Sequence, residues 1–170
     1  MHDYIIKELP EFIGSIFTVD PKKKCVSGHS MGGHGAMSLT LRNPGHFQSA
    51  SAFAPIYNPT KCPWGKTCFE GYLGSVDAGK EYDTIEILKS YNGPRVPIRV
   101  EQGTDDKFLQ TLGGTQLDPQ SLITVCGETN YPLQFNWRTG YDHSYYMIST
   151  FISEHVEFHA NNLGLCRKQQ

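Results

Sequence analysis

Apolar side chains recur every three or four positions near the start of the chain. The positions concerned are Tyr4, Ile5, Leu9, Phe12, Ile13, Ile16 and Phe17. This spacing is typical of the apolar face of an α-helix. Pro10 lies inside the pattern and weakens the prediction near its middle, because proline has no backbone N–H to donate. We therefore expect an amphipathic helix over residues 4–17.

Short strand-like runs alternate with longer helical patterns along the rest of the chain. Strands are predicted at residues 24–27, 48–54, 98–102 and 133–137. Helices are predicted at residues 31–41, 82–90, 119–129 and 145–163. This alternation is typical of an α/β fold with a largely parallel sheet. Residues 55–79 do not follow it, and their proline, glycine and aromatic content indicates an insertion above the sheet.

Length and composition narrow the class of protein. A chain of 170 residues fits one domain, so we interpret residues 1–170 as a single domain. Hydrophobic residues make up 38% and charged residues 19%, which favours a globular protein with a real core. The 15 basic and 17 acidic residues give a net charge of −2, which offers no attraction to nucleic acid or anionic lipid. We therefore expect a small-molecule partner.

The cysteines and the start of the chain bear on the compartment. Five cysteines stand at irregular spacing, at Cys25, Cys62, Cys68, Cys126 and Cys166. An odd number without a regular pattern favours free thiols in a reducing compartment. No apolar run approaches the roughly 20 residues that span a bilayer, and the first residues do not form a basic segment followed by an apolar one. We expect a cytoplasmic protein that is neither exported nor inserted in a membrane.

A serine lies between two glycines in the stretch SGHSMGGHGA, residues 27–36. Residues 28–32 match G-x-S-x-G, in which a strand turns sharply into a helix and holds the serine in a strained conformation. The predicted strand before Ser30 and helix after it supply that context. Both flanking glycines are expected to let the turn close without a clash, and Gly33 to ease helix packing. An ordinary glycine-rich turn before a helix is the alternative.

A serine hydroxyl needs a base to take its proton and an acid to orient that base. In α/β-hydrolases the acid and then the histidine follow the serine along the chain. Asp105 and Asp106 come directly after the predicted strand 98–102, and His143 comes shortly after the strand 133–137. Because parallel strands present their carboxyl ends at one edge of the sheet, these side chains should converge there. Spacing alone does not separate the two aspartates.

Other histidines and cysteines are weaker candidates for chemistry. His34 is expected to serve packing or to face solvent. His155 and His159 have a spacing that can hold zinc, but their context is not H-E-x-x-H and no third ligand is evident, so we interpret them as a solvated helix face. Cys62 and Cys68 lack the short paired spacing of zinc sites. We assign no metal and no cofactor.

Four stretches carry a longer pattern, namely SGHSMGGHGAMSLTLRNPGHFQSASAFAPIYNPTKCPWG, FEGYLG, EQGTDDKFL and GYDHSYYMISTFISEHVEFHANNLGL. Together they closely resemble the S-formylglutathione hydrolase family, also called esterase D. The resemblance runs from about Tyr4 to Leu165, and CPWGK and GYDHSYY are its most specific parts. It implies an α/β-hydrolase that cleaves S-formylglutathione to glutathione and formate in cytosolic formaldehyde detoxification, without a cofactor.

The resemblance also implies roles for individual residues. The nucleophile falls on Ser30 and the histidine on His143. The family's acid stands one residue before an x-Phe-Leu step, which selects Asp106 over Asp105. The backbone N–H of Met31 is implied as one donor to the oxyanion.

Length is the largest departure from the family. Its members carry, before the region matching Tyr4, a long segment with the first strands of the sheet and a glycine-rich loop that gives the second oxyanion donor. We therefore expect an α/β-hydrolase fold lacking those first strands, and interpret the chain as a partial or truncated gene product. Loss of one donor costs roughly 10² to 10³ in rate in comparable sites. The strand at residues 24–27 would become an uncovered edge that invites aggregation.

The proposed chemistry sets expectations for the substrate site. A thiol has a pKa near 8.5, so a thiolate leaves more easily than an amine, and thioester cleavage suits the site. A formyl group needs little room, so we expect a tight acyl pocket with Trp64 and Tyr57 as candidate walls, although core packing explains both equally well. Lys61 and Lys66 are candidates to contact the glutathione carboxylates, but a solvated surface is the favoured interpretation for each. Two alternatives stay open: a general carboxylesterase, and an inert fragment that binds a full-length hydrolase. A homodimer also stays open.

Overall fold

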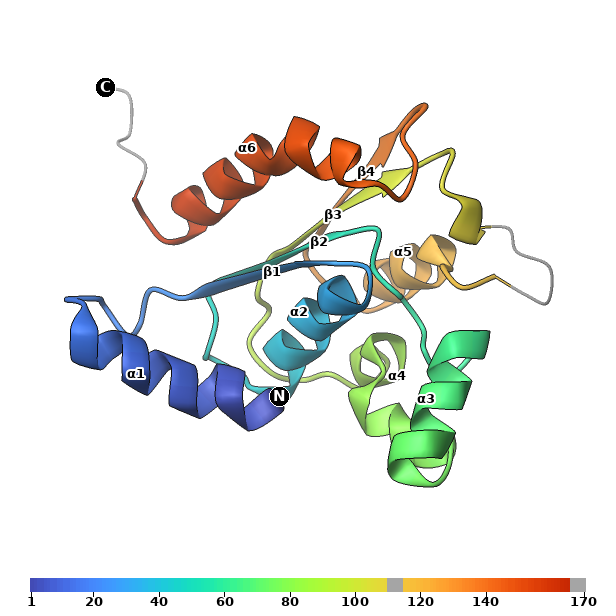
Figure 1. Ribbon diagram of the computed structural model, residues 1–170, viewed down its shortest axis with the longest axis horizontal. Coiled ribbons are helices and arrows are strands. Elements are labelled where there is room, and N and C mark those ends of the chain that lie inside the picture. Colours follow the sequence, from blue (N-terminus) through green and yellow to red (C-terminus); the bar gives the residue numbers. More distant parts are fainter. Residues whose placement is uncertain (110–114, 166–170) are drawn as a thin grey trace.

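The computed structural model describes residues 1–109 and 115–165. It contains a sheet of four parallel strands in the spatial order β1-β2-β3-β4, which is also their order along the chain (Figure 1). The strands are β1 (Cys25–His29), β2 (Ser49–Phe53), β3 (Ile98–Gly103) and β4 (Leu133–Arg138). The predicted α/β class with a parallel sheet is confirmed, and each predicted strand overlaps an observed one.

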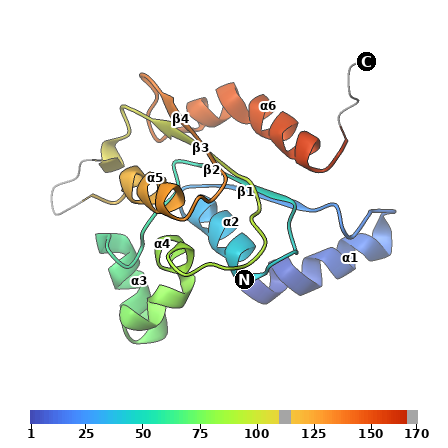
Figure 2. The ribbon, with the colours of Figure 1, turned by 180° about the vertical axis from the view of Figure 1, so that it is seen from behind.

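Helices connect successive strands on one face of the sheet. They are α2 (Met31–Arg42) between β1 and β2, α4 (Thr84–Leu88) between β2 and β3, and α5 (Pro119–Glu128) between β3 and β4. Figure 2 shows α4 and α5 on the same side of the sheet as α2. Right-handed crossovers between neighbouring parallel strands place all three helices on that side. The final helix, α6 (Tyr145–Asn162), covers the opposite face (Figure 1).

The two faces of the sheet differ in chemistry, because successive side chains of a strand point to opposite faces. Ala50, Ala52, Ile98 and Val100 belong to the apolar core together with residues of α2 and α5. Apart from Phe53, the alternate positions of the same two strands are polar, and α6 packs onto them. They are Ser49, Ser51, Arg99 and Glu101, all of them buried. The apolar core therefore lies between the sheet and α2, α4 and α5.

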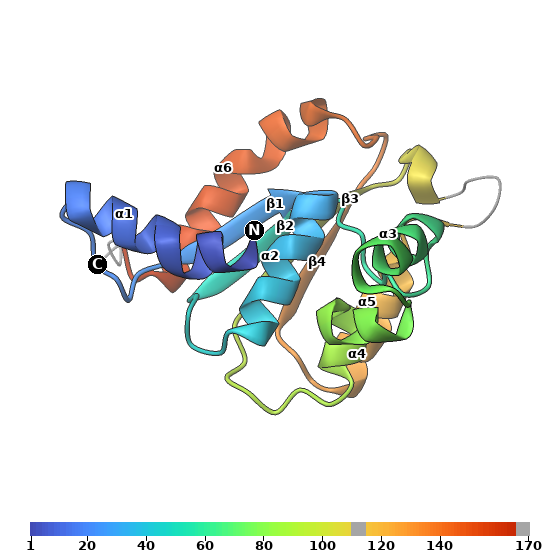
Figure 3. The ribbon, with the colours of Figure 1, turned by 60° about the horizontal axis from the view of Figure 1, so that its bottom comes forward.

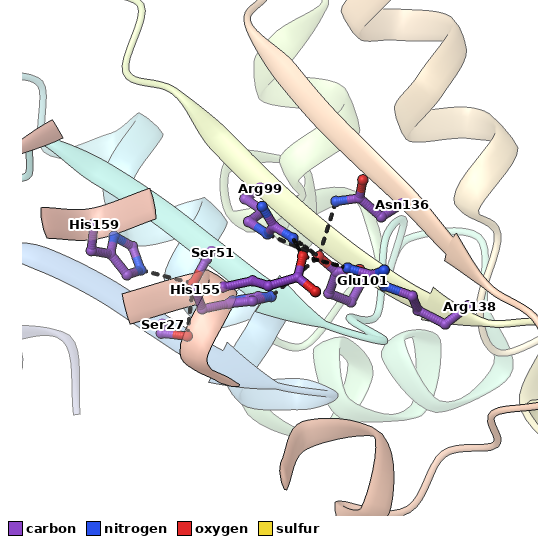
Figure 4. A network of polar contacts seen from close by, with 9 residues as sticks. Ser27, Ser51, Arg99, Glu101, Asn136, Arg138, His155 and His159 are labelled. Atoms are coloured by element: carbon purple, nitrogen blue, oxygen red, sulfur yellow. Dashed lines mark hydrogen bonds and ion pairs between the residues drawn. The ribbon is translucent and has the colours of Figure 1, made fainter. Parts of the chain in front are cut away.

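The histidines of α6 correct one sequence expectation. His155 and His159 are buried, not solvated. The two ring nitrogens of His159 lie 2.7 Å from the Ser49 hydroxyl and 2.8 Å from the Ser51 hydroxyl. The His155 ring stacks on Phe53 with ring centroids 3.8 Å apart. His159 faces inward because the Ser49 and Ser51 hydroxyls bond it there, and His155 because its ring stacks on Phe53; Figure 4 shows His159 beside Ser51.

The amino-terminal helix differs in detail from its prediction. Residues Tyr4–Glu8 form a π-helix that continues into α1 (Leu9–Ile16), with Pro10 in the first turn of α1. Because the π-helix precedes it without a break, Pro10 lies inside one continuous helical segment and lacks the N–H that would bond the preceding turn. No residue of α1 is buried, and the helix lies at the side of the molecule away from α4 and α5 (Figure 3).

The segment after β2 contains a helix that the sequence analysis missed, α3 (Pro63–Leu73). Pro63 opens it, and Gly74 follows it in the left-handed conformation with φ of 78°. A proline at the start and a glycine just past the end were available as signals. The predicted helix 82–90 is also wrong in part. A 3₁₀-helix (Asp77–Tyr82) ends there, and extended Asp83 caps the separate α4.

Cysteines and membrane-spanning segments complete the description. Cys25, Cys62, Cys68 and Cys126 are free thiols. Cys166, the fifth cysteine of the prediction, lies outside the described residues. Within the two described ranges, no helix combines the length and the apolar character that crossing a membrane requires.

Candidate active site

Ser30 occupies the joint between β1 and α2, in a backbone conformation that side chains rarely adopt. Its φ is 56° and its ψ is −117°. Its N–H donates to the carbonyl of Phe53, and its own carbonyl accepts from the N–H groups of His34 and Ile56, at 2.9, 3.0 and 3.2 Å. Such a conformation costs about 1–3 kcal/mol and persists only where the surroundings impose it. These three bonds present the serine side chain at the carboxyl edge of the sheet.

The glycines around Ser30 have unequal roles. A Cβ on Gly28 would collide with the carbonyl group of Gly32. A Cβ on Gly33 would lie 3.0 Å from Pro55 and 3.2 Å from Ala52, which is a tight approach. A Cβ on Gly32 would meet nothing within 4 Å. The expectation that both flanking glycines relieve a clash is therefore wrong for Gly32, and the turn depends on Gly28 and Gly33.

His143 joins Ser30 to Asp106. Its Nε2 lies 2.9 Å from the Ser30 Oγ, and its Nδ1 lies 2.6 Å from the Asp106 Oδ2. The aspartate comes from the loop after β3 and the histidine from the loop after β4, so both stand at the carboxyl ends of neighbouring strands. The structure thus brings together the three side chains that the sequence singled out. In this arrangement the imidazole can take the hydroxyl proton while the carboxylate stabilises the resulting imidazolium.

Asp106 is buried and fully engaged. Its Oδ1 accepts from the Phe108 N–H at 2.9 Å, and its Oδ2 accepts from the Gln102 amide at 3.0 Å as well as facing His143. Burial alone would raise the pKa of this carboxyl. The bonds from His143, Phe108 and Gln102 outweigh it and hold the pKa below its usual value. Asp105 is exposed, and its carboxylate accepts from Thr104 instead.

Gln102 is a site residue that the sequence analysis missed. It is buried at the end of β3, and its Oε1 accepts from the hydroxyl of Tyr57 at 2.9 Å. This bond orients the amide so that its NH₂ group faces Asp106. A glutamine inside a buried strand, four residues before the acid, was the available signal. Tyr57 therefore supports the acid through Gln102.

Two rings frame His143. Phe108 meets it edge to face with centroids 4.8 Å apart, and His29 lies 4.6 Å away at an angle of 44°. Burial lowers the pKa of His29, and the nearby His143 lowers it further. In the sequence analysis Phe108 served only as the Phe of the x-Phe-Leu step that selects Asp106, and His29 had no role. They limit how far the imidazole of His143 can swing.

A cavity of about 660 Å³ adjoins Ser30. Most of its wall is apolar, including Met31, Ile56, Trp64 and Phe69. Trp64 thus lies where the sequence analysis expected it. Tyr57 does not line this cavity; of the two interpretations left open for it, the pocket wall is wrong and core packing is confirmed, because its ring is buried in the core. The cavity also exceeds what a formyl group fills, contrary to the expected tight pocket.

The structure also locates the other residues that the sequence analysis considered. His34 lines the cavity, and burial lowers its pKa to about 4. Met31 is the first residue of α2, where backbone N–H groups have no partner inside the helix. Lys61 is exposed, as expected. Among the residues that the structure describes, no three histidine, cysteine or acidic side chains cluster as metal ligands would.

Comparisons with known proteins give the chain its relatives. A protein-family model described as "Putative esterase" matches residues 1–159. S-formylglutathione hydrolase of Rattus norvegicus is 49% identical over 165 residues, and that of Arabidopsis thaliana is 44% identical over 167. These matches cover 96% and 97% of this chain. The chain spans 57% of the length of each of these two relatives.

Solved structures give the same fold. An S-formylglutathione hydrolase from Agrobacterium tumefaciens superposes with a TM-score of 0.87 at 37% identity, over 96% of this chain and 57% of the other. One from Staphylococcus aureus superposes with a TM-score of 0.74 at 22% identity, over 93% of this chain and 63% of the other. The architecture is that of an α/β-hydrolase.

Proposed function

This chain belongs to the esterase family, and on that premise we propose that it is the part of a serine hydrolase that cleaves S-formylglutathione to glutathione and formate. The observation that carries the proposal is the continuous contact from Ser30 through His143 to Asp106. The substrate is suggested by the relatives, which are named S-formylglutathione hydrolases at 44–49% identity.

The reaction proceeds in two stages. His143 Nε2 takes the proton of Ser30 Oγ while that oxygen attacks the formyl carbon, and the Met31 N–H donates to the oxyanion. The tetrahedral intermediate collapses as the carbon–sulfur bond breaks, and glutathione leaves as a thiol with the proton from His143. A water molecule, deprotonated by His143, then attacks the formyl-serine. Formate leaves, and the proton returns to Ser30. Asp106 stays ionised throughout and stabilises the imidazolium.

Two assays on one set of variants test the proposal. Ser30→Ala should abolish release of glutathione from S-formylglutathione and labelling by a fluorophosphonate probe. Ser15→Ala, an exposed serine of α1, serves as the control and should change neither. If folded protein takes up no probe at Ser30, the serine mechanism is wrong and the inert-fragment alternative stands. If it takes up the probe but leaves S-formylglutathione intact, the substrate is wrong.

The cavity beside Ser30 favours a second candidate, a carboxylesterase for apolar esters. Its volume of about 660 Å³ and its apolar wall suit an acyl chain longer than formyl. We compare kcat/KM for p-nitrophenyl acetate, butyrate and hexanoate with that for S-formylglutathione. If kcat/KM rises with acyl length and exceeds the value for S-formylglutathione, the esterase is favoured. If kcat/KM falls from acetate to the longer acyl groups, the thioesterase is favoured.

We further propose a cytoplasmic location and a single domain. The four free thiols support a reducing compartment. One sheet with one apolar core supports a single domain.

A further inference from the structure

The loops that carry Asp106 and His143 meet at the backbone of Arg138. The Arg138 carbonyl accepts from the N–H of Thr104, at 3.0 Å, and from the N–H of Tyr141, at 3.3 Å. Thr104 opens the loop after β3, and Tyr141 lies in the loop after β4. One residue at the end of β4 therefore joins the two loops.

The side chain of Arg138 extends the same junction. Its Nε donates to Glu101 Oε2 at 2.5 Å, and its Nη2 donates to Glu154 Oε2 at 2.7 Å. Its guanidinium carbon lies 3.8 Å from the centre of the Phe151 ring. Glu101 belongs to β3, whereas Glu154 and Phe151 belong to α6. Arg138 thus links β3, β4 and α6, the three elements that border the two loops (Figure 4).

Glu101 is the buried carboxylate of a charge-balanced network, whose second carboxylate, Glu154, is partly exposed. Glu101 is fully buried and also accepts from Arg99 at 2.8 Å and from Asn136 at 2.9 Å. Burial would raise the pKa of its carboxyl, but contacts with His155, Arg138 and Arg99 outweigh this and keep the pKa below its usual value. A buried ion without partners is costly, so the guanidinium and carboxylate positions are strongly coupled.

We propose that Arg138 is a positioning residue for His143, holding the histidine loop at the distance from the aspartate loop that lets the imidazole reach Ser30 and Asp106. The proposal rests on the proposed function, in which these three side chains react. The planar fork of arginine suits it, because two carboxylates in different directions fix both position and orientation. A misplacement of about 1 Å can cost roughly 10²-fold in rate.

Arg99 provides a matched control inside the same network. It donates to Glu101 and contacts Glu154, the same two carboxylates that bind Arg138. It lies at the second position of β3, away from both loops. Arg99→Gln therefore disturbs the buried charges without touching the junction of the loops. Arg138→Gln keeps the carbonyl that joins the loops but removes the side-chain link from that residue to Glu101 and Glu154.

The experiment measures the hydrogen bond between His143 and Asp106 by proton NMR, and then kcat and KM. The Nδ1–H of His143, bonded to Asp106, should give a low-field proton resonance in the unaltered chain. We expect Arg138→Gln to shift or broaden this resonance and to lower kcat about 10- to 100-fold while KM stays within about threefold. Arg99→Gln should keep the resonance and most of kcat. Arg138→Lys should recover part of the loss because it keeps the positive charge. The recovery should be incomplete because an ammonium cannot bind both carboxylates as the planar guanidinium does.

Further variants and outcomes keep the test decisive. If Arg138→Gln does not fold, Glu154→Gln replaces it, because this partly exposed carboxylate is one end of the Arg138 link; a smaller shift of the same resonance is expected. The proposal is overturned if the resonance is unchanged in Arg138→Gln and in Glu154→Gln. It is also overturned if Arg99→Gln and Arg138→Gln change the resonance equally. Because the resonance needs no turnover, failure to hydrolyse S-formylglutathione would refute the proposed substrate and leave this test intact.

Discussion

At the scale of single residues, the site depends on a strained serine held by its neighbours. The backbone of Ser30 can adopt its unusual conformation only because the chain approaches itself closely at two glycines, Gly28 and Gly33. Beside them, Gly32 has open space around it. The strain therefore has an identifiable steric origin that substitution can test.

We expect Gly28→Ala and Gly32→Ala to have opposite effects on stability. The methyl group at position 28 would meet the Gly32 carbonyl, so the free energy of unfolding should fall by at least about 2 kcal/mol, and the hydrolase reaction should be lost. At position 32 it meets nothing, and alanine favours helix, so stability should stay equal or rise by up to about 1 kcal/mol. Urea unfolding of both variants measures this. An equal loss of unfolding free energy in the two variants would show that the contact between position 28 and the Gly32 carbonyl is not the reason for glycine in this turn.

Which residues converge was predictable, but not how each is supported. Motif order and the carboxyl ends of parallel strands are local or topological features, so they select Ser30, His143 and a pair of aspartates. The bond from Tyr57 to Gln102 joins residues 45 positions apart, and only packing creates it. The size of the cavity depends on α3, which the sequence analysis missed.

At the scale of elements, α6 is the most informative. Its length and position were predictable because it carries a long helical pattern before the carboxyl end. Its inward face was not, because two histidines at i, i+4 look alike whether they face water or hydroxyls. The alternating S-A-S-A pattern of β2 places Ser49 and Ser51 under the helix, and this pairing decides the orientation.

We expect the docking of α6 to weaken as pH falls, in part through His159. Burial lowers the pKa of His159 to about 4, against 6.5 for the unperturbed group. Between pH 6.5 and about 4, His159 is protonated in the unfolded chain but stays neutral in the folded chain. The stability present above pH 6.5 is therefore lost progressively down to about pH 4. The difference between these values corresponds to about 3 kcal/mol.

His159→Gln isolates that contribution, because glutamine can still bond the serine hydroxyls but does not titrate. The variant should be less stable than the unaltered chain at pH 8, and the gap between them should narrow by about 3 kcal/mol towards pH 4. Denaturant unfolding across this range measures it. Parallel pH profiles for the two proteins would mean that His159 does not carry the dependence.

At the scale of the whole molecule, the described fold leaves two surfaces open on the side of β1. β1 is an edge of the sheet, with unpaired backbone groups along one side. α1 exposes Phe12 and Ile16, and Phe17 directly follows it; each of the three is more than half accessible. A net charge of −2 gives little repulsion between copies. The open edge at β1 was expected from the resemblance, whereas the exposed apolar face of α1, which an amphipathic helix usually buries, and the polar cluster under α6 were not.

We therefore expect the chain to self-associate as its concentration rises, through the β1 edge and the apolar face of α1. Sedimentation equilibrium should show a mass that increases with concentration. Cys25→Lys, which adds a charge to the exposed start of the edge strand, and the pair Phe12→Ser with Ile16→Ser should each reduce it. Tyr72→Ser, which removes a large and still more exposed side chain from α3, is the control and should leave the association unchanged. A monomeric mass at all concentrations would contradict the prediction. An equal decrease of association in the α3 variant would show that the contact does not lie at the β1 edge and α1, because only substitutions within a contact surface should weaken it.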